Sequence, residues 1–249
     1  MSRKFLILFI LFLNISLLAQ ECRVLRVGGN SEWYPVNFIN ENTNKTEGIA
    51  YDFARLIGKE LNLEVEIYPS YPWKRMLAYV EHGKLDVVAA LYWTKQRANI
   101  YTYSKAYFRN EARVFVLKNK KFKLEKLEDL IGLRGGTPFG GSYGDNFDSF
   151  AQKNLNLKHT TTKRQYIGML LQNRIDYFIL DHQDGLIYLK KNALEDKIVA
   201  LDYPISTTKV YFAFSKHSPC IKLLGSINKL ILESSFDGTL EALIHKYTK

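Results

Sequence analysis

One arginine in the first half of the chain has a setting suited to anion binding. The apolar run at residues 86–91 predicts a buried strand, and Thr94 after it is a good helix N-cap. Arg97 then falls in the first helical turn, where the helix dipole disfavours a cation. A bound anion, most naturally a carboxylate held by two hydrogen bonds, would explain this position. A surface arginine paired with a nearby acid is the alternative.

A second stretch invites a catalytic interpretation. Residues 140–144, Gly-Gly-Ser-Tyr-Gly, fit the G-x-S-x-G pattern of a hydrolase, with Ser142 as the nucleophile. That pattern requires the serine on a sharp turn directly after a strand. Residues 137–139 intervene here, and Pro138 argues against a strand that runs into Ser142. The sequence therefore argues against hydrolysis.

The first residues of the chain indicate that the protein is exported. Residues 1–19 have a basic start, an apolar stretch and a small residue, Ala19, near a cleavage point, as export signals do. The stretch is shorter than the roughly 20 residues that span a bilayer. Gln20 and Glu21 argue against lipid attachment at Cys22. We expect the signal to be cleaved and the protein to be periplasmic.

Charge and cysteines narrow the possibilities further. The formal net charge is +10, but the positive residues are scattered, which argues against nucleic-acid binding. Two cysteines in an exported chain invite a disulfide between Cys22 and Cys220. Closing so long a loop would stabilise the fold, and two free thiols are the alternative.

An internal repeat predicts the architecture. Residues 79–91 and 170–180 both consist of a helix end, a turn, a basic–aliphatic–Asp triplet and an apolar strand. Strands that alternate with helices indicate parallel sheets, and two copies indicate two similar α/β lobes. Ligands bind beyond the carboxyl ends of such strands, here at residues 90–97 and 181–182. The two lobes would offer a cation and a carboxylate, the complement of a zwitterion.

Other chemistries find little support. Asp86 and Asp176 resemble a catalytic carboxylate pair, but both begin the repeated strands, opposite the expected ligand edge, which favours a structural role. The five histidines form no close pair, and the cysteines are far apart, which argues against a zinc site. We expect neither a metal nor a cofactor.

The order and spacing of short motifs resemble the extracellular solute-binding proteins of family 3, type II periplasmic binding proteins that serve ABC transporters for polar amino acids. The resemblance covers nearly all of the mature chain. Its motifs lie at residues 25–28, 48–53, 83–86, 94–97, 103–104, 127–130, 173–181 and 236–239. It implies a two-lobed α/β fold, each lobe a mostly parallel sheet flanked by helices. Lobe 1 would comprise residues 20–108 and 211–249, and lobe 2 residues 109–210, joined by two hinge crossings.

The resemblance also implies ligand contacts. Arg97 matches the arginine that clamps the α-carboxylate, and Asp181 matches the acid that receives the α-ammonium group. Trp33 and Trp73 fall where aromatic rings face the ligand side chain. Ser142 and Tyr143 lie in a loop whose helix start contributes donors to the carboxylate. Two further expected contacts depart from the family pattern: Asn30, where members that prefer basic amino acids carry an acid, and Tyr92, where Ser or Thr is usual.

These residues imply a binding protein rather than an enzyme. It would capture an amino acid or related carboxylate between the lobes and deliver it, as a monomer, to a membrane ABC permease. Two alternatives keep the fold: a lyase or dehydratase acting on small carboxylates, or a stand-alone sensor protein. An enzyme would need a general acid or base, for which His182 beside Asp181 is the candidate.

Overall fold

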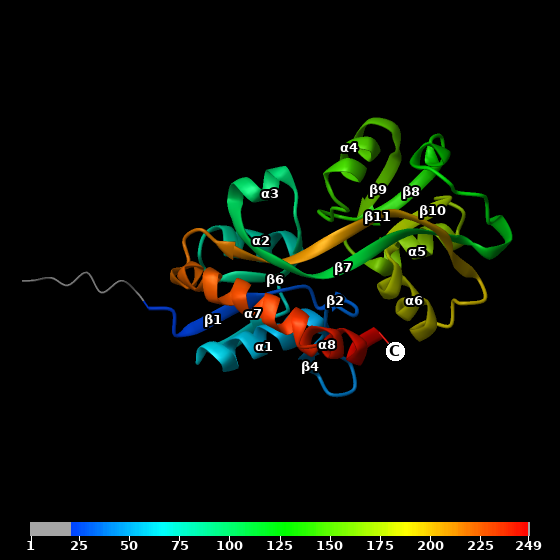
Figure 1. Ribbon diagram of the computed structural model, residues 1–249. Helices are drawn as coiled ribbons and strands as arrows, with labels where there is room; N and C mark the ends of the chain where they lie inside the picture. Colours follow the sequence, from blue (N-terminus) through cyan, green and yellow to red (C-terminus); the bar gives the residue numbers. More distant parts are fainter. Residues whose placement is uncertain (1–20, 249) are drawn as a thin grey trace, which may run out of the picture.

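The computed structural model describes residues 21–248, so the expected export signal lies outside the described residues. Two α/β halves lie side by side, and two long strands run from one half into the other (Figure 1). These strands are β7 (Tyr101–Leu117) and β11 (Ile198–Ser215), which pair antiparallel along most of their length. Both are longer than the sequence predicted, because each continues from one half of the molecule to the other.

One mixed sheet of eight strands connects the halves, in the order β5-β1-β6-β11-β7-β10-β8-β9. The outer strands on each side are parallel, and β11 is antiparallel to β6 as β10 is to β7. The strands of the first half are β1 (Val24–Gly28), β5 (Glu64–Tyr68) and β6 (Val87–Tyr92). Those of the second half are β8 (Arg134–Pro138), β9 (Asn156–Thr160) and β10 (Tyr177–Asp181). This is the two-part α/β architecture that the repeat predicted.

Helices cover both halves. The first half carries α1 (Ile49–Leu61), α2 (Trp73–Glu81), α3 (Lys95–Ile100), η3 (Pro219–Leu223), α7 (Leu224–Phe236) and α8 (Thr239–Thr248). The second half carries η1 (Lys118–Lys120), η2 (Leu127–Leu130), α4 (Asp145–Asn154), α5 (Lys163–Leu171) and α6 (His182–Lys191). Every residue of β6 and of β10 is buried, as expected for parallel strands covered on both faces. A small second sheet consists of β2 (Glu32–Trp33), β3 (Asn37–Asn40) and β4 (Lys45–Glu47), and β3 and β4 form a hairpin.

The glycines after residue 132 predict a loop that follows Arg134, and this prediction is wrong. Residues 134–138 form β8, and β9 was not anticipated. Gly135 and Gly136 serve close packing rather than a turn, because a Cβ on Gly135 would lie 2.4 Å from Leu157 and 2.6 Å from Tyr177. Pro138 is the last residue of the strand, where the ladder to β10 has already ended.

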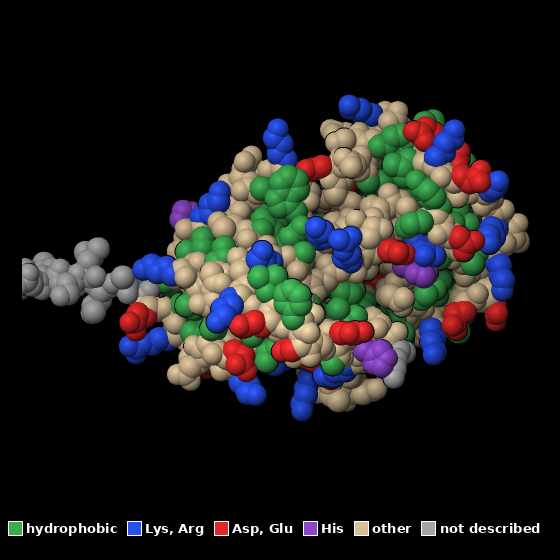
Figure 2. Space-filling view, in the orientation of Figure 1, with side chains coloured by type: hydrophobic (Ala, Val, Ile, Leu, Met, Phe, Trp, Pro, Cys, Tyr) green, Lys and Arg blue, Asp and Glu red, His purple; other side chains and the backbone are tan. Residues whose placement is uncertain are grey.

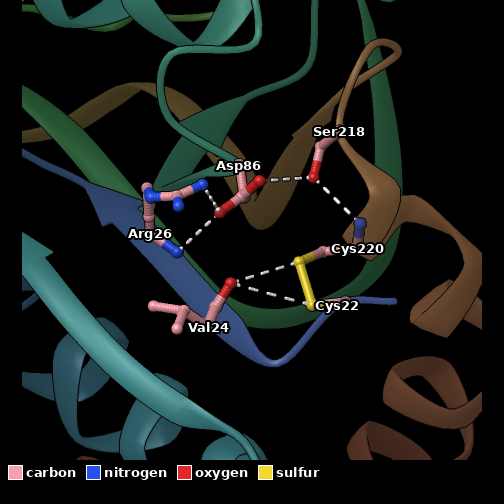
Figure 3. Close-up of a disulfide and its surroundings, with 6 residues drawn as sticks. All are labelled: Cys22, Val24, Arg26, Asp86, Ser218 and Cys220. Carbon is pink, nitrogen blue, oxygen red and sulfur yellow. Dashed lines mark hydrogen bonds and ion pairs between the residues drawn. A yellow bond between two sulfur atoms is a disulfide. The ribbon is translucent and has the colours of Figure 1, made fainter. Parts of the chain in front are cut away.

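The two repeated aspartates have the structural role that their positions favoured. Asp86 accepts the Arg26 amide at 2.8 Å, and Asp176 accepts the Arg134 amide at 2.8 Å. In both copies the aspartate amide donates in return to the carbonyl of the same arginine. Asp86 also accepts the hydroxyl of Ser218, which lies beside the disulfide (Figure 3).

The disulfide has the expected pairing. Cys22 and Cys220 are bonded, so the segment before β1 is tied to η3 near the end of the chain (Figure 3). Figure 2 shows lysine and arginine side chains distributed over the visible face rather than gathered in one patch. No helix within residues 21–248 has the combined length and apolar character that a bilayer crossing requires.

Candidate ligand-binding site

A cavity of about 370 Å³ lies between the two halves, near the low end of the roughly 300–1,000 Å³ typical of small-molecule sites. Its wall includes Tyr92 at the end of β6 and Asp181 at the end of β10, the strand ends where an α/β sheet binds ligands. All eight residues predicted to contact the ligand line it: Asn30, Trp33, Trp73, Tyr92, Arg97, Ser142, Tyr143 and Asp181. The fold thus brings them to one place, while their roles toward a ligand stay predictions.

Arg97 is positioned as the sequence suggested. The Thr94 hydroxyl caps α3 by accepting the Arg97 amide at 3.1 Å. The guanidinium donates to two main-chain carbonyls, those of Tyr92 at 3.1 Å and Gly140 at 3.4 Å. Within residues 21–248 it forms no ion pair with an acid. Burial lowers the pKa of Arg97, and the charge of the nearby Asp148 acts in the opposite direction.

Asp181 is a buried carboxylate held by a tyrosine. The Tyr92 hydroxyl donates to Asp181 Oδ1 at 2.7 Å, and the Asn110 amide donates to the Tyr92 oxygen at 3.0 Å. Desolvation raises the pKa of Asp181 to about 7, while the Tyr92 hydrogen bond lowers it and the nearby Asp184 raises it further. The charge of Lys163 also lowers this pKa, but within residues 21–248 Asp181 forms no ion pair with a cation.

Trp33 packs edge-on against Tyr92, with ring centroids 5.2 Å apart. Its indole nitrogen lies close enough to Asp181 to lower the pKa of that carboxyl, yet it completes no hydrogen bond within the described chain. Trp73 is fixed differently, because its indole donates to the Gly140 carbonyl at 3.1 Å. The two tryptophans thus stand at different parts of the wall.

In the loop before α4, the donors expected to meet a ligand have a partner within the protein. The Ser142 hydroxyl donates to Asp148, and the Tyr143 amide donates to the same carboxylate at 2.9 Å. The Tyr143 hydroxyl donates to the Ile179 carbonyl at 3.0 Å. Asp148, one turn into α4, thus occupies the donors that were expected to meet a ligand carboxylate. The partner of Ser142 is an acid rather than a histidine, so no hydrolase arrangement forms there.

Sequence reasoning missed one pair in this cavity. Lys163 Nζ lies 2.5 Å from Asp184 Oδ1, and the two side chains are only 13% and 4% exposed. Both also reach the other half of the molecule: Lys163 donates to the Glu32 carbonyl, and Asp184 accepts the Tyr34 amide at 3.2 Å. The available signal was the spacing of Asp184, one helical turn beyond Asp181.

Within residues 21–248, no group of three or more His, Cys, Asp or Glu side chains could hold a metal ion. His182 is not among the cavity-lining residues, and burial lowers its pKa. The cavity presents Arg97 and Asp181 together with the Lys163–Asp184 ion pair.

Two α/β halves joined by paired strands, with a cavity at the strand ends between them, define a periplasmic binding protein of type II. Residues 25–249 match the family described as bacterial extracellular solute-binding proteins, family 3, and the chain belongs to this family. The family is extracellular or periplasmic, binds small amino-acid ligands and works with ABC transporters.

Individual relatives are distant but cover the chain. The L-cystine-binding protein TcyJ of Escherichia coli (strain K12) is 26% identical over 92% of this chain and 84% of that protein. The structure of an ancestral arginine-binding protein bound to arginine is 27% identical, with a TM-score of 0.78, over 91% of this chain and 99% of the other. Enzymes also occur among the relatives. Membrane-bound lytic murein transglycosylase F of Aeromonas hydrophila is 23% identical over 91% of this chain but 44% of that protein.

Proposed function

We propose that this protein is an exported, non-catalytic binding protein that captures an α-amino acid in the cavity and delivers it to an ABC permease. The observation that carries the proposal is that Arg97 and Asp181 line the same cavity. The cation suits an α-carboxylate and the carboxylate suits an α-ammonium group. A zwitterion would give each group the ion-pair partner that it lacks within residues 21–248.

The proposal includes movement of two lobes, residues 20–108 with 211–249 and residues 109–210. Several hydrogen bonds of the described structure cross between them, including Tyr92 to Asp181 and Trp73 to Gly140. The paired strands change lobe where Arg109 faces Lys209 and Phe108 faces Val210. A ligand that contacts both lobes would favour the closed form, which a permease would then recognise. We further propose that the mature protein is a periplasmic monomer without residues 1–19.

A dehydratase or lyase of the same fold is less well supported. Such an enzyme needs an acid or base within reach of the substrate. His182 was the sequence candidate, and it lies outside the cavity lining. A binding role requires none of this chemistry.

Calorimetric titration of two variants tests the proposal. A thermal-shift screen of the twenty common amino acids selects the titrant, and its deaminated acid serves as the comparison. Arg97→Ala should lose both ligands, whereas Asp181→Asn should lose the preference for the amino acid. Each change should cost about 2 to 5 kcal/mol of binding free energy, because it leaves a ligand charge desolvated and unpaired.

Arg75→Ala is the matched control, because Arg75 is exposed on α2 and does not line the cavity. Equal binding of both ligands by the unmodified protein would remove Asp181 from the mechanism. Normal binding by Arg97→Ala would place the site elsewhere.

A further inference from the structure

We infer that the cavity selects amino acids with a large, uncharged side chain, and that the Lys163–Asp184 pair excludes charged ones. This inference rests on the proposed function, since it assumes that Arg97 and Asp181 hold the amino-acid backbone. It concerns what the rest of the cavity offers to the ligand side chain.

The charged residues of the cavity support a preference for uncharged side chains. Besides Arg97 and Asp181, the charged residues of the wall that are not exposed are Lys163 and Asp184. These two form an ion pair at 2.5 Å and are almost fully buried. A ligand ammonium or guanidinium would have to displace Lys163 to reach Asp184, and a ligand carboxylate would have to displace Asp184. After the backbone of an amino acid has been bound, no buried charge of the described wall remains unneutralised.

Two features at the cavity edge do not change this balance. Glu32 lines the cavity, but it is exposed, and an exposed carboxylate contributes little to binding a cation. Phe139 could offer an aromatic face to a cation, but Lys74 Nζ already lies 3.8 Å from the centre of that ring. The protein's own ammonium group thus occupies the place of a ligand cation.

The uncharged part of the wall favours a large side chain. It consists mainly of aromatic rings and threonines, among them Tyr71, Trp73, Tyr166 and residues 160–162. Such a surface gains stability from each apolar group that it covers, about 0.8 kcal/mol per buried methylene, which is roughly fourfold in affinity. A small ligand such as alanine would leave most of these contacts unmade.

The cross-lobe contacts explain how the pair could keep its position. Lys163 begins α5 and Asp184 lies in the first turn of α6, so both belong to the second half of the molecule. In the described structure they also bind the Glu32 carbonyl and the Tyr34 amide of the first half. These contacts hold each side chain on its partner, and neither is left to turn toward a ligand.

Titration of the unmodified protein with phenylalanine, leucine, alanine, arginine and glutamate provides the first test. Phenylalanine or leucine should bind at least about 20-fold more tightly than alanine. Either should bind at least about 100-fold more tightly than arginine or glutamate, whose side-chain charge would be buried unpaired. Equal or tighter binding of arginine, glutamate or alanine would overturn the inference and leave the proposed function intact. If none of the five binds, the inference fails, and the screen of the twenty common amino acids decides the proposed function separately.

Two variants test the role of the pair directly. Lys163→Met leaves Asp184 unpaired, so arginine should gain at least about tenfold in affinity. Asp184→Asn leaves Lys163 unpaired, so glutamate should gain by a similar factor. The double variant, which carries neither charge, should keep the original order of ligands, and Arg164→Met, an exposed neighbour outside the cavity, should change nothing. If neither single variant gains the matching charged ligand while both remain folded, the pair does not set selectivity. If a single variant unfolds, the titrations of the unmodified protein and the double variant still decide the question.

Discussion

The repeated aspartates provide a stability test with an internal comparison. Asp86 and Asp176 hold the same place in the two halves, and each accepts the amide of an arginine on the neighbouring strand at 2.8 Å. They differ in burial: the Asp86 side chain is 1% exposed and that of Asp176 is 32% exposed. Replacing each with alanine therefore removes a similar set of hydrogen bonds, in one case from a buried site and in the other from a site that water can reach.

The expected loss in the free energy of unfolding depends on the hydrogen-bond donors that each variant leaves without an acceptor. Asp86→Ala leaves the Arg26 amide and the buried Ser218 hydroxyl without their acceptor. A hydrogen bond to a charged group contributes about 1.5 to 3 kcal/mol, so two such bonds amount to about 4 kcal/mol. Asp176→Ala also removes contacts to the Arg134 guanidinium, at 2.7 and 3.0 Å. Water can replace these, and the cost should be about 1 kcal/mol.

Urea unfolding of the ligand-free protein measures both free energies, with Asp196→Ala as an exposed control that should change stability by less than about 0.5 kcal/mol. Asp86→Ala should be the less stable variant by about 3 kcal/mol. Equal losses, or a larger loss for Asp176→Ala, would show that burial does not govern the strength of this arrangement.

Two further predictions concern the site charge and the disulfide. The Asp181 carboxyl has a pKa of about 7 in the folded protein, against about 4 when unfolded, so burying it lowers stability progressively as pH rises from 4 to 7. Asp181→Asn should therefore raise the melting temperature at pH 8 but not at pH 4. The amino-acid affinity of the unmodified protein should rise up to about tenfold between pH 6 and pH 8, and the affinity of the variant should not change over this range. Cys22 and Cys220 are 198 residues apart, so their bond should contribute up to about 5 kcal/mol by restricting the unfolded chain. Mass spectrometry of the non-reduced exported protein should find them linked, and an unchanged urea midpoint after reduction would contradict the stabilising role.

The sequence by itself determined the features that depend on local order. Helical spacing and the Thr94 cap located α3 and placed Arg97 in its first turn. The repeated triplets ending in Asp86 and Asp176 predicted two similar halves, because strand and helix periodicities are properties of short segments. The resemblance of ordered motifs also named eight contact residues, and all eight line one cavity.

The local sequence did not predict the strands β8 and β9, because tertiary packing overrides the propensity of their residues. Glycine and proline in β8 favour a loop, yet these residues pair with β9 and β10 as a strand, in which Tyr177 and Leu157 leave no room for a larger residue at Gly135. The strand β9 lies at the edge of the sheet and is largely exposed, so it lacks the apolar alternation that marks buried strands.

Only the tertiary structure decided which charges of the cavity remain available. The contacts of Lys163 with Glu32 and of Asp184 with Tyr34 join residues 131 and 150 positions apart. Asp148 takes the donors of the loop before α4, which a motif comparison assigned to the ligand. No periodicity encodes the contacts of Lys163 and Asp184 with the first half, because they form only where the two halves meet and each buried polar group must find a partner.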